Sequence, residues 1–314
     1  MSILSAPHFH NEAAAIAHLE ALVWSDGPYC PRCGGFDRIT PVKGGRAGLR
    51  RCGPCKREFT VTVGTVFERS HIKLHKWFQA AHLMASSKKG ISAHQLHRTL
   101  EITYKTAWFM EHRLREAMRE LLPTKQLGGE GKTVEVDETY IGGKEKNKHR
   151  SKRVKGNIGG QGKEVVFSLV ERGGFVRSHH VPEVSAKTLR PVLVAQVDCK
   201  SFLMTDDAGQ YRIMGPEFAS HDVVNHGAGE YVRGEAHTNT IEGYFSTLKR
   251  GINGTYHHVS QQHLKRYLAE FDFRYNTRSA IGINDIARAD LLVSGIVGKR
   301  LTYRDSSVPV AAGE

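Results

Sequence analysis

Two cysteine pairs near the N-terminus constrain the fold of this chain more than any other feature of its sequence. They read Cys30-Pro-Arg-Cys33 and Cys52-Gly-Pro-Cys55, with 18 residues between the pairs. Each pair can hold two thiolates on one tight turn, and two such turns joined by a short hairpin complete the tetrahedral coordination of one zinc ion. Disulfides are the alternative, but they are rare in a reducing compartment. We therefore predict a structural zinc ribbon over residues 27–66, with all four cysteines as ligands.

A strong excess of positive charge indicates a polyanionic partner. The 314 residues include 45 Lys and Arg against 32 Asp and Glu, which gives a formal net charge of +13. Seven Lys or Arg residues and one Glu lie between Gly143 and Lys155. Such a segment fits a phosphate backbone, so nucleic acid is the expected partner, although a solubilising loop would have the same composition.

The remaining composition is that of a soluble globular protein. Hydrophobic residues make up 39% of the chain and charged residues 25%, and a chain of this length can form two or three domains. No apolar run approaches the roughly 20 residues that a membrane-spanning helix needs. The first residues also lack the pattern of a secretion signal. We therefore expect a cytoplasmic protein with no membrane partner.

Helices are predicted on both sides of the ribbon. A short N-terminal helix lies within residues 1–26, with Asn11 as its N-cap. After the ribbon, residues 70–122 contain three helical segments, and Ser92 and Thr103 can cap the second and third. Short breaks between such segments are typical of a helix-turn-helix, so we predict a DNA-binding region here. A plain three-helix bundle would have a similar sequence.

The third helical segment carries a basic side suited to DNA. That side comprises Lys105, Trp108, His112, Arg113 and Arg115. This segment would be the second helix of the helix-turn-helix, and cationic side chains on that helix lie close to the duplex. We therefore expect Lys105 and Arg113 to contact DNA.

A linker over residues 123–132, rich in Gly and polar residues, separates the helices from a second domain. In residues 133–300 predicted strands alternate with helices, which indicates an α/β domain. Residues 301–314 are interpreted as a tail.

Acidic residues fall at the ends of two predicted strands and at the start of one helix. They are Asp137, Asp206 and Glu242. Mg²⁺ binds carboxylate oxygens, and two such ions about 3.5–4 Å apart can serve an in-line displacement at phosphorus. Lys249 lies two helical turns after Glu242 on the same side of the helix. The pattern indicates a phosphoryl-transfer site, although each acid alone is more often a turn or cap former.

Strand periodicity leaves the choice among neighbouring acids open. Asp206 is followed by Asp207, and Asp137 is flanked by Glu135 and Glu138. Alternation sends adjacent side chains to opposite faces of a sheet, and the sequence does not say which face carries the site.

The motifs of the chain, taken in order, resemble those of the bacterial DDE transposases of insertion-sequence family 1595, which are ISXO2-like transposases. The resemblance rests on CPRCG with CGPCKREFTVTVGTVF, SSKKGISAHQLHRTL with YKTAWFMEHRLR, VEVDETYIGGKEKNKH, TDDAGQY, and HTNTIEGYFSTLKRGINGTYHHVS with HLKRYLAEFDFRYNTR. These motifs cover about residues 15 to 285. The resemblance implies a ribonuclease-H-like catalytic domain, a mixed sheet flanked by helices, preceded by the zinc ribbon and the all-α helix-turn-helix region.

The resemblance also implies which acids hold the metal. The first acid of the family lies in the VDET segment and corresponds to Asp137. The second precedes a Tyr by five positions, here Tyr211, which selects Asp206. The third corresponds to Glu242, with Asn239 as a secondary candidate, because some relatives have Asn in place of this acid. The expected catalytic cofactor is Mg²⁺ or Mn²⁺, beside the structural Zn²⁺.

Lys249 matches the family's lysine seven residues after the third acid, and we expect it to contact DNA phosphate near the reacting end. The full set of expected DNA contacts is Lys105, Arg113, Lys144, Lys146, Lys148, Lys249 and Arg250.

The activity implied by the resemblance is that of an insertion-sequence transposase. Such a protein binds the terminal inverted repeats of its element as double-stranded DNA, cuts the ends in a metal-dependent step, and joins them to target DNA. A homo-oligomer in a synaptic complex and a location at the bacterial nucleoid are also implied. Two alternatives stay open: a nuclease on the same fold, and a non-catalytic, domesticated zinc-ribbon DNA-binding regulator, against which the intact acid set argues.

Overall fold

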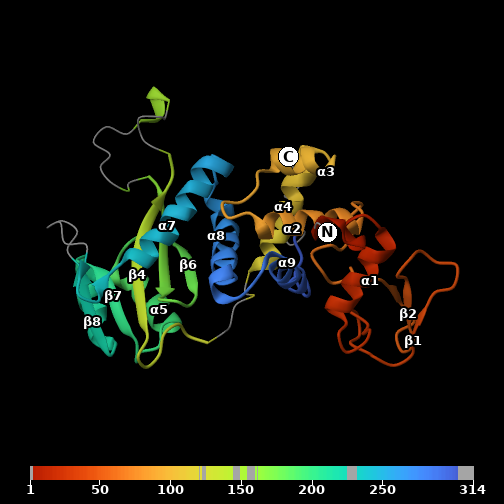
Figure 1. Ribbon diagram of the computed structural model, residues 1–314, viewed down its shortest axis with the longest axis horizontal. Coiled ribbons are helices and arrows are strands. Elements are labelled where there is room, and N and C mark those ends of the chain that lie inside the picture. Colours follow the sequence, from red (N-terminus) through yellow and green to blue (C-terminus); the bar gives the residue numbers. More distant parts are fainter. Residues whose placement is uncertain are drawn as a thin grey trace, which may run out of the picture. The chain divides into compact units, whose positions relative to one another are not determined.

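The computed structural model divides the chain into two compact units. It describes residues 3–119, 121, 125–143, 149–153, 160, 162–224 and 232–302. The first of the two units, called the ribbon–helix unit here, comprises Met1–Ser87, Ile91–Leu121 and Asn284–Glu314. The second, the sheet unit, comprises Lys88–Gly90 and Leu122–Ile283 (Figure 1).

A small antiparallel sheet follows the first helix of the ribbon–helix unit. Helix α1 spans Glu12–Val23, and the side chain of Asn11 accepts a hydrogen bond from the backbone N–H of Ala14 at 3.0 Å. The predicted N-cap is therefore confirmed. The sheet has the order β1-β2-β3. Its strands are Ile39–Pro41, Arg50–Cys52 and Glu58–Phe59.

Three helices lie where the sequence predicts them. They are α2 (Leu74–Ser86), α3 (Ala93–Leu100) and α4 (Tyr104–Met118). The predicted caps are confirmed as well, because Ser92 accepts from the N–H of Gln95 and Thr103 from that of Thr106, each at 3.2 Å.

A fourth helix, α9 (Asp285–Ser294), packs against α2 and α4. Its buried residues include Leu292 and Val293, and Arg288 donates to the carbonyl of Ala85 on α2 at 3.3 Å. The expected second domain, residues 133–300, therefore differs from the structure at its C-terminal end. Residues from Asn284 onward belong to the ribbon–helix unit, because the apolar side of α9 is buried against its helices.

The sheet unit is built on a mixed five-stranded sheet in the order β6-β5-β4-β7-β8. Strand β4 pairs antiparallel with β5 and parallel with β7; β5 pairs antiparallel with β6, and β7 parallel with β8. The strands are β4 (Thr133–Ile141), β5 (Glu164–Glu171), β6 (Val176–Val181), β7 (Phe202–Asp206) and β8 (Ser220–Val224). A two-stranded pair, β9 (Val232–Arg233) with β10 (Ala236–His237), precedes the next helix.

Helices cover both faces of this sheet. One core cluster joins Val134 and Val136 of β4 to Leu189 of helix α5 (Ala186–Gln196) and Tyr211 of helix α6 (Gly209–Met214). The predicted mixed sheet flanked by helices is thereby confirmed.

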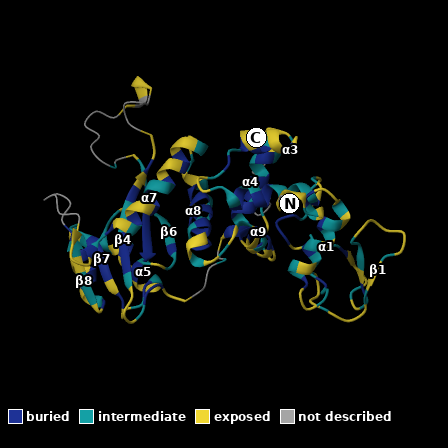
Figure 2. Ribbon diagram, in the orientation of Figure 1, coloured by how far each residue is buried: buried dark blue, intermediate teal, exposed yellow. Residues whose placement is uncertain are grey.

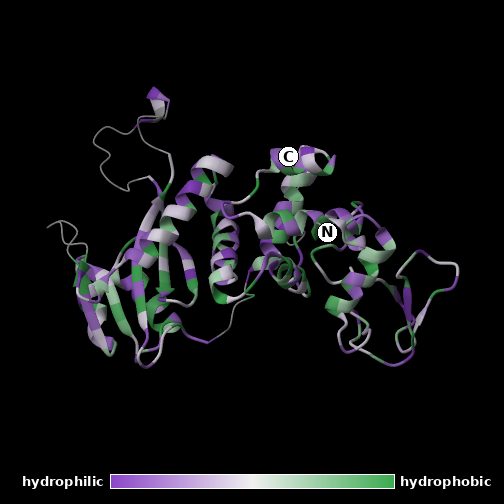
Figure 3. Ribbon diagram, in the orientation of Figure 1, coloured by the Kyte–Doolittle hydropathy of each residue, from purple (hydrophilic) through white to green (hydrophobic). Residues whose placement is uncertain are grey.

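The other face is covered by α7 (Asn239–Gly251) and α8 (Gln261–Asn276). A five-residue π-helix, Ile252–Tyr256, extends α7. Figure 1 shows α7 running across β4, with α8 beside β6. Buried residues in Figure 2 and hydrophobic residues in Figure 3 follow the central strands and one side of each helix, as expected for two apolar layers around a sheet.

Alternation along β4 sends neighbouring side chains to opposite faces of the sheet, with Glu138 on the side of the valines, where it meets Tyr211 of α6. Val134 and Val136 point to the α5 side, so Glu135 and Asp137 point to the α7 side. Among the described residues, no helix is long and apolar enough to cross a bilayer.

Two neighbouring leucines of α9 provide a matched test of its packing. Leu292 is fully buried, whereas Leu291 is 40% exposed. We expect Leu292→Ala to lower the stability of the ribbon–helix unit by about 2–5 kcal/mol, because it removes buried contacts and leaves a cavity. Leu291→Ala should change it by less than about 1 kcal/mol. The stability of each variant would be measured by denaturant unfolding, and hydrogen exchange of the amides in α2 and α4 would show whether the loss falls on these helices. Equal effects of the two substitutions would contradict this packing.

Candidate functional site

The pairing of β4 with β7 brings two of the expected acids together. Asp206 ends β7 as predicted, whereas the prediction that Asp137 ends a strand is wrong, because β4 continues to Ile141. Glu135 lies opposite Met204 in this parallel pair. Two residues further along each strand, Asp137 and Asp206 lie side by side on the same face. Helix α7 covers that face, and Glu242 stands in its first turn.

The charges of these side chains act on one another. Burial raises the pKa of Asp137 to about 8, and the neighbouring carboxylates of Glu138, Asp206 and Glu242 raise it in the same direction. Carboxylates that raise the pKa of a neighbouring acid are stabilised by protons or by cations. The arrangement is therefore suited to binding a divalent cation.

Local hydrogen bonds orient each acid. Asp137 accepts from the N–H of Glu138 at 2.7 Å, and Asp206 accepts from the N–H of Ala208 at 3.2 Å. The carboxylate of Glu242 accepts from the hydroxyl of Thr238 at 3.1 Å. Each of these hydrogen bonds comes from a residue close to the acid in the sequence, and it fixes the direction of the carboxylate.

The neighbouring acids have other partners. Asp207 directly follows the end of β7 and forms an ion pair with Arg212 of α6 at 2.5 Å. Glu138 accepts from the hydroxyl of Tyr211 and, at 3.2 Å, from the amide nitrogen of Gln210. Burial raises the pKa of Glu138, while the Tyr211 hydrogen bond lowers it. Tyr211 thus ties α6 to the strand of Asp137, a role that sequence spacing does not reveal.

Four thiols form a tighter cluster in the ribbon. The sulfur atoms of Cys30 and Cys55 are 3.7 Å apart, and those of Cys33 and Cys52 are 3.6 Å apart. Tetrahedral zinc with Zn–S bonds of about 2.3 Å requires S···S distances of about 3.8 Å, whereas a disulfide requires about 2.05 Å. Within the described part of the chain, the four cysteines form the one group of three or more His, Cys, Asp or Glu residues whose metal-ligating atoms all lie within 4.8 Å of one another.

The metal-free thiols differ in acidity. A backbone hydrogen bond at Cys55 lowers the pKa of Cys52, but burial and the neighbouring thiols raise it to about 12, whereas the pKa of Cys30 is lowered. Burial raises the pKa of the Cys30 thiol, but hydrogen bonds from the backbone N–H groups of Arg32 and Cys33 outweigh it and bring the pKa to about 7. Zinc binds the thiolate form of cysteine. The donor set and its spacing therefore fit a structural zinc ion.

The basic residues expected to contact DNA fall into different environments. Lys249 and Arg250 are exposed at the end of α7, and the guanidinium of Arg250 donates to the hydroxyl of Ser246 at 2.6 Å. Asn239, the secondary candidate for the third acid, is the first residue of α7 and is exposed. Lys144, Lys146 and Lys148 lie outside the described residues.

The basic side expected on α4 is largely internal. His112 and Arg115 are buried, and Arg115 pairs with Glu111 one turn earlier at 3.2 Å. Arg113 is partly buried, and its guanidinium donates to the carbonyl of Leu301 at 3.3 Å. Only the start of α4, with Lys105, is exposed. The expectation of an exposed basic side is wrong for His112 and Arg115, because the packing of the helices buries that part of α4.

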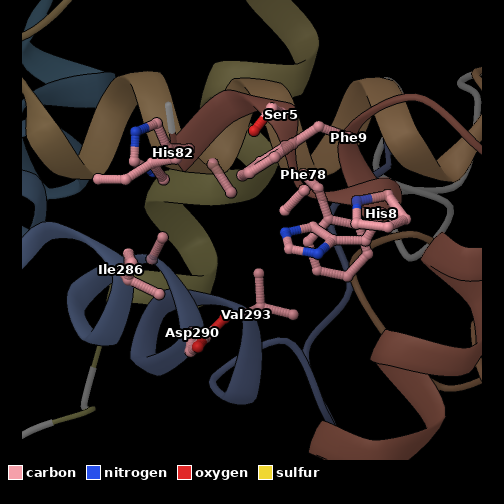
Figure 4. A pocket seen from close by; sticks show the side chains of 13 residues that line it. Ser5, His8, Phe9, Phe78, His82, Ile286, Asp290 and Val293 are labelled. Carbon is pink, nitrogen blue, oxygen red and sulfur yellow. The ribbon is translucent and has the colours of Figure 1, made fainter. Parts of the chain in front are cut away.

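A cavity of about 430 Å³ lies in the ribbon–helix unit (Figure 4). The N-terminal segment, α2 and α9 line it, mostly with apolar side chains such as Phe9, Phe78 and Val293. Its polar residues include His82 and Asp290. It contains none of the acids of the sheet unit, so we assign it no part in the chemistry of that site.

Comparison with known proteins places the chain among transposases. Residues 126–276 match the family described as ISXO2-like transposase domain, and residues 10–58 match the transposase zinc-ribbon domain. A protein of transposable element ISH50 from Halobacterium salinarum, itself uncharacterized, is 31% identical over 284 residues, which cover 85% of this chain and 91% of that one. An uncharacterized transposase-like protein of Haemophilus influenzae is 26% identical over 96 residues, 31% of this chain and 76% of that one. The chain belongs to the ISXO2-like family of insertion-sequence transposases.

The cysteine cluster generates a prediction with an internal control. We expect the purified protein to retain about one zinc ion per chain, and Cys52→Ser to lose it, because three thiolates and a hydroxyl hold zinc more weakly. Cys199→Ser should retain the metal, since Cys199 is exposed and stands outside the cluster. Atomic absorption after gel filtration measures the ratio. Equal zinc content in the two variants would contradict the assignment.

The raised pKa of Asp137 predicts how stability depends on pH without divalent cations. Between its usual value of 3.8 and about 8, the folded chain holds a proton that the unfolded chain has lost. The free energy of unfolding therefore falls as pH rises through this window. Asp272, whose pKa burial raises to about 6, acts in the same direction.

We expect Asp137→Asn to weaken this dependence and to raise the melting temperature at pH 8 by roughly 5 °C in EDTA. Added Mg²⁺ should stabilise the wild type at pH 8 and leave the variant unchanged. Asp207→Asn is the control, because its carboxylate pairs with Arg212 instead. Thermal unfolding at pH 5 and pH 8 measures these effects, and a wild type that becomes more stable with rising pH would refute the prediction.

Proposed function

We propose that this transposase binds the terminal inverted repeats of its own element and catalyses divalent-metal-dependent DNA strand cleavage and strand transfer. The observation that carries the proposal is that Asp137 and Asp206 lie on neighbouring parallel strands, and that Glu242, in the first turn of α7, acts with Asp206 on the pKa of Asp137. Carboxylates that approach one another from separate elements suit Mg²⁺ or Mn²⁺.

We also propose that the sheet unit is a ribonuclease-H-like domain. Its first three strands form an antiparallel meander, and two further strands add in parallel to the other side of the first. The proposed ligands then come from the first strand, the fourth strand and a helix on one face. The strand order and directions support this proposal.

The proposed roles follow from the position of each side chain. Asp137, Asp206 and Glu242 would hold the cations, which supply Lewis-acid activation of the attacking oxygen and stabilisation of the leaving oxygen in an in-line displacement at phosphorus. The carboxylates fix the ligand geometry, and the burial of Asp137 keeps bulk water from screening the charges. Lys249, exposed two turns after Glu242, would contact a phosphate of the DNA.

Recognition of DNA would use exposed cations of both units. In the helix-turn-helix that we propose for α3 and α4, Lys105 lies in the exposed first turn of the second helix, where such motifs approach the duplex. Arg113 would contact DNA only after leaving the Leu301 carbonyl. Lys249 and Arg250, with the lysines at 144, 146 and 148, complete the proposed set. A homo-oligomer would hold two ends together.

Two adjacent aspartates give the direct test. Asp206→Ala should lower cleavage and joining by at least about 100-fold, because it removes a proposed metal ligand, whereas Asp207→Ala should stay within a few-fold of wild type. The measurement uses labelled DNA with the element's terminal repeat and a target plasmid, with Mg²⁺ or EDTA, on a denaturing gel. Repeat binding by both variants serves as the folding control.

The products distinguish the candidate functions. Metal-dependent joined products would establish a transposase, and cleavage without joining would favour a nuclease. Tight repeat binding by the wild type with no metal-dependent product would identify a non-catalytic regulator. Equal loss of activity in Asp206→Ala and Asp207→Ala would refute the proposed acid set.

A further inference from the structure

Glu135 is a fully buried carboxylate that none of the roles above uses. It lies on β4 two residues before Asp137, and its side chain has no exposure to solvent. A buried carboxylate is costly unless hydrogen-bond donors surround it. Its donors are the guanidinium of Arg172 at 2.7 Å, the hydroxyl of Thr240 at 2.9 Å and the backbone N–H of Ile241 at 2.9 Å.

Two of these donors belong to the first turn of α7. That turn has no cap from its own N-cap residue, because the side chain of Thr238 makes no capping hydrogen bond to the helix. The Thr238 hydroxyl donates instead to the carboxylate of Glu242. Glu135 therefore caps α7 from a different element, and its negative charge lies at the positive end of the helix dipole.

Arg172 fixes the chain that leads into α7. It directly follows β5 and pairs with Glu135 through its Nε. Its two other nitrogens donate to the carbonyls of Glu235 at 3.0 Å and His237 at 2.8 Å. The ring of His237 also lies 3.3 Å from the Glu135 carboxylate. One buried ion pair thus holds both the first turn of α7 and the segment before it.

We propose that Glu135 is a positioning residue that sets where Glu242 stands relative to Asp137. Asp137 follows Glu135 by two residues on the same face of the same strand, and Glu242 follows Ile241 directly on the helix that Glu135 caps. The Glu135 carboxylate therefore connects the strand of Asp137 to the first turn of the helix that carries Glu242. The inference rests on the proposed function, because it assumes that these acids share cations.

A residue with a merely structural role would change stability without changing metal affinity. If Glu135 positions Glu242, its loss should weaken cation binding at the site while DNA binding persists. Partners that orient metal ligands typically change metal affinity by about 10–100-fold.

Glu135→Gln is the principal variant, because it keeps the shape of the side chain. Its amide group would face donors, so at least one of the three loses its acceptor. Glu171→Gln is the matched control. Glu171 is also a buried carboxylate of the sheet, but it accepts from the N–H of Gly128 at 2.9 Å and from Lys132 at 2.7 Å instead of from α7.

The experiment has two readouts on the full-length zinc-loaded protein. Mn²⁺ binding is measured by electron paramagnetic resonance, since Mn²⁺ prefers oxygen ligands over the ribbon thiolates. Hydrogen exchange reports the Ile241 amide. For Glu135→Gln we expect Mn²⁺ affinity to fall about 10-fold or more and exchange in the first turn of α7 to accelerate at least 10-fold. Glu171→Gln should change neither by more than about 2-fold.

Thr240→Val is the second variant in case Glu135→Gln does not fold. It removes the hydroxyl that donates to Glu135 but keeps the ion pair between Glu135 and Arg172. We expect it to lower Mn²⁺ affinity about 2–5-fold. Unchanged Mn²⁺ affinity in a folded Glu135→Gln or, failing that, in Thr240→Val would overturn the inference. An equal fall in Glu171→Gln would overturn it as well. A wild type that binds no Mn²⁺ at this site would reject the proposed function itself, and this result differs visibly from the other two.

Discussion

The parallel pairing of β4 with β7 is the constraint on which the candidate active site depends. Asp137 lies in the middle of β4 and Asp206 ends β7, and the parallel register makes them neighbours although 68 residues lie between them in the sequence. Valines on the opposite face fix the direction in which the acids point, because a slip of one residue would turn the acids into the apolar cluster beneath α5 and α6 and the valines toward α7. The hydrophobic core of the sheet unit thereby determines on which face Asp137 and Asp206 lie.

The carboxylates of the candidate site repel one another, and hydrogen bonds from nearby residues partly offset this repulsion. Burial and neighbouring carboxylates raise the pKa of Asp137 to about 8, so the cation-free site must keep a proton on Asp137 near neutral pH or, at higher pH, tolerate the repulsion of its carboxylates. Hydrogen bonds to the strand, to α6 and to the first turn of α7 hold the acids despite their repulsion. A site assembled against repulsion in this way gains most when cations arrive, because they convert the repulsion into attraction.

Motifs and caps in the sequence predict the ribbon and the helices α1 to α4, because each depends on local residues such as Asn11, Ser92 and the four cysteines. The mixed sheet is expected only from the family resemblance. Other features depend on which elements meet. Alternation alone could not separate Asp206 from Asp207, and only the register with β4 shows which one faces Asp137. Burial of Arg115 inside the helices and the packing of α9 on α2 are likewise set by tertiary contacts.

The zinc ribbon and the proposed carboxylate site are built in opposite ways. The ribbon supplies four soft thiolates within one short segment, so a single ion satisfies the whole set and closes it to substrate. The sheet unit supplies hard carboxylates from two strands and a helix, whose oxygens are less closely grouped than the four thiols. An open arrangement leaves coordination positions for water and phosphate, but it requires its ligands to be held by other residues. The buried carboxylate of Glu135, bonded to Arg172 and to the start of α7, is well placed to provide that support.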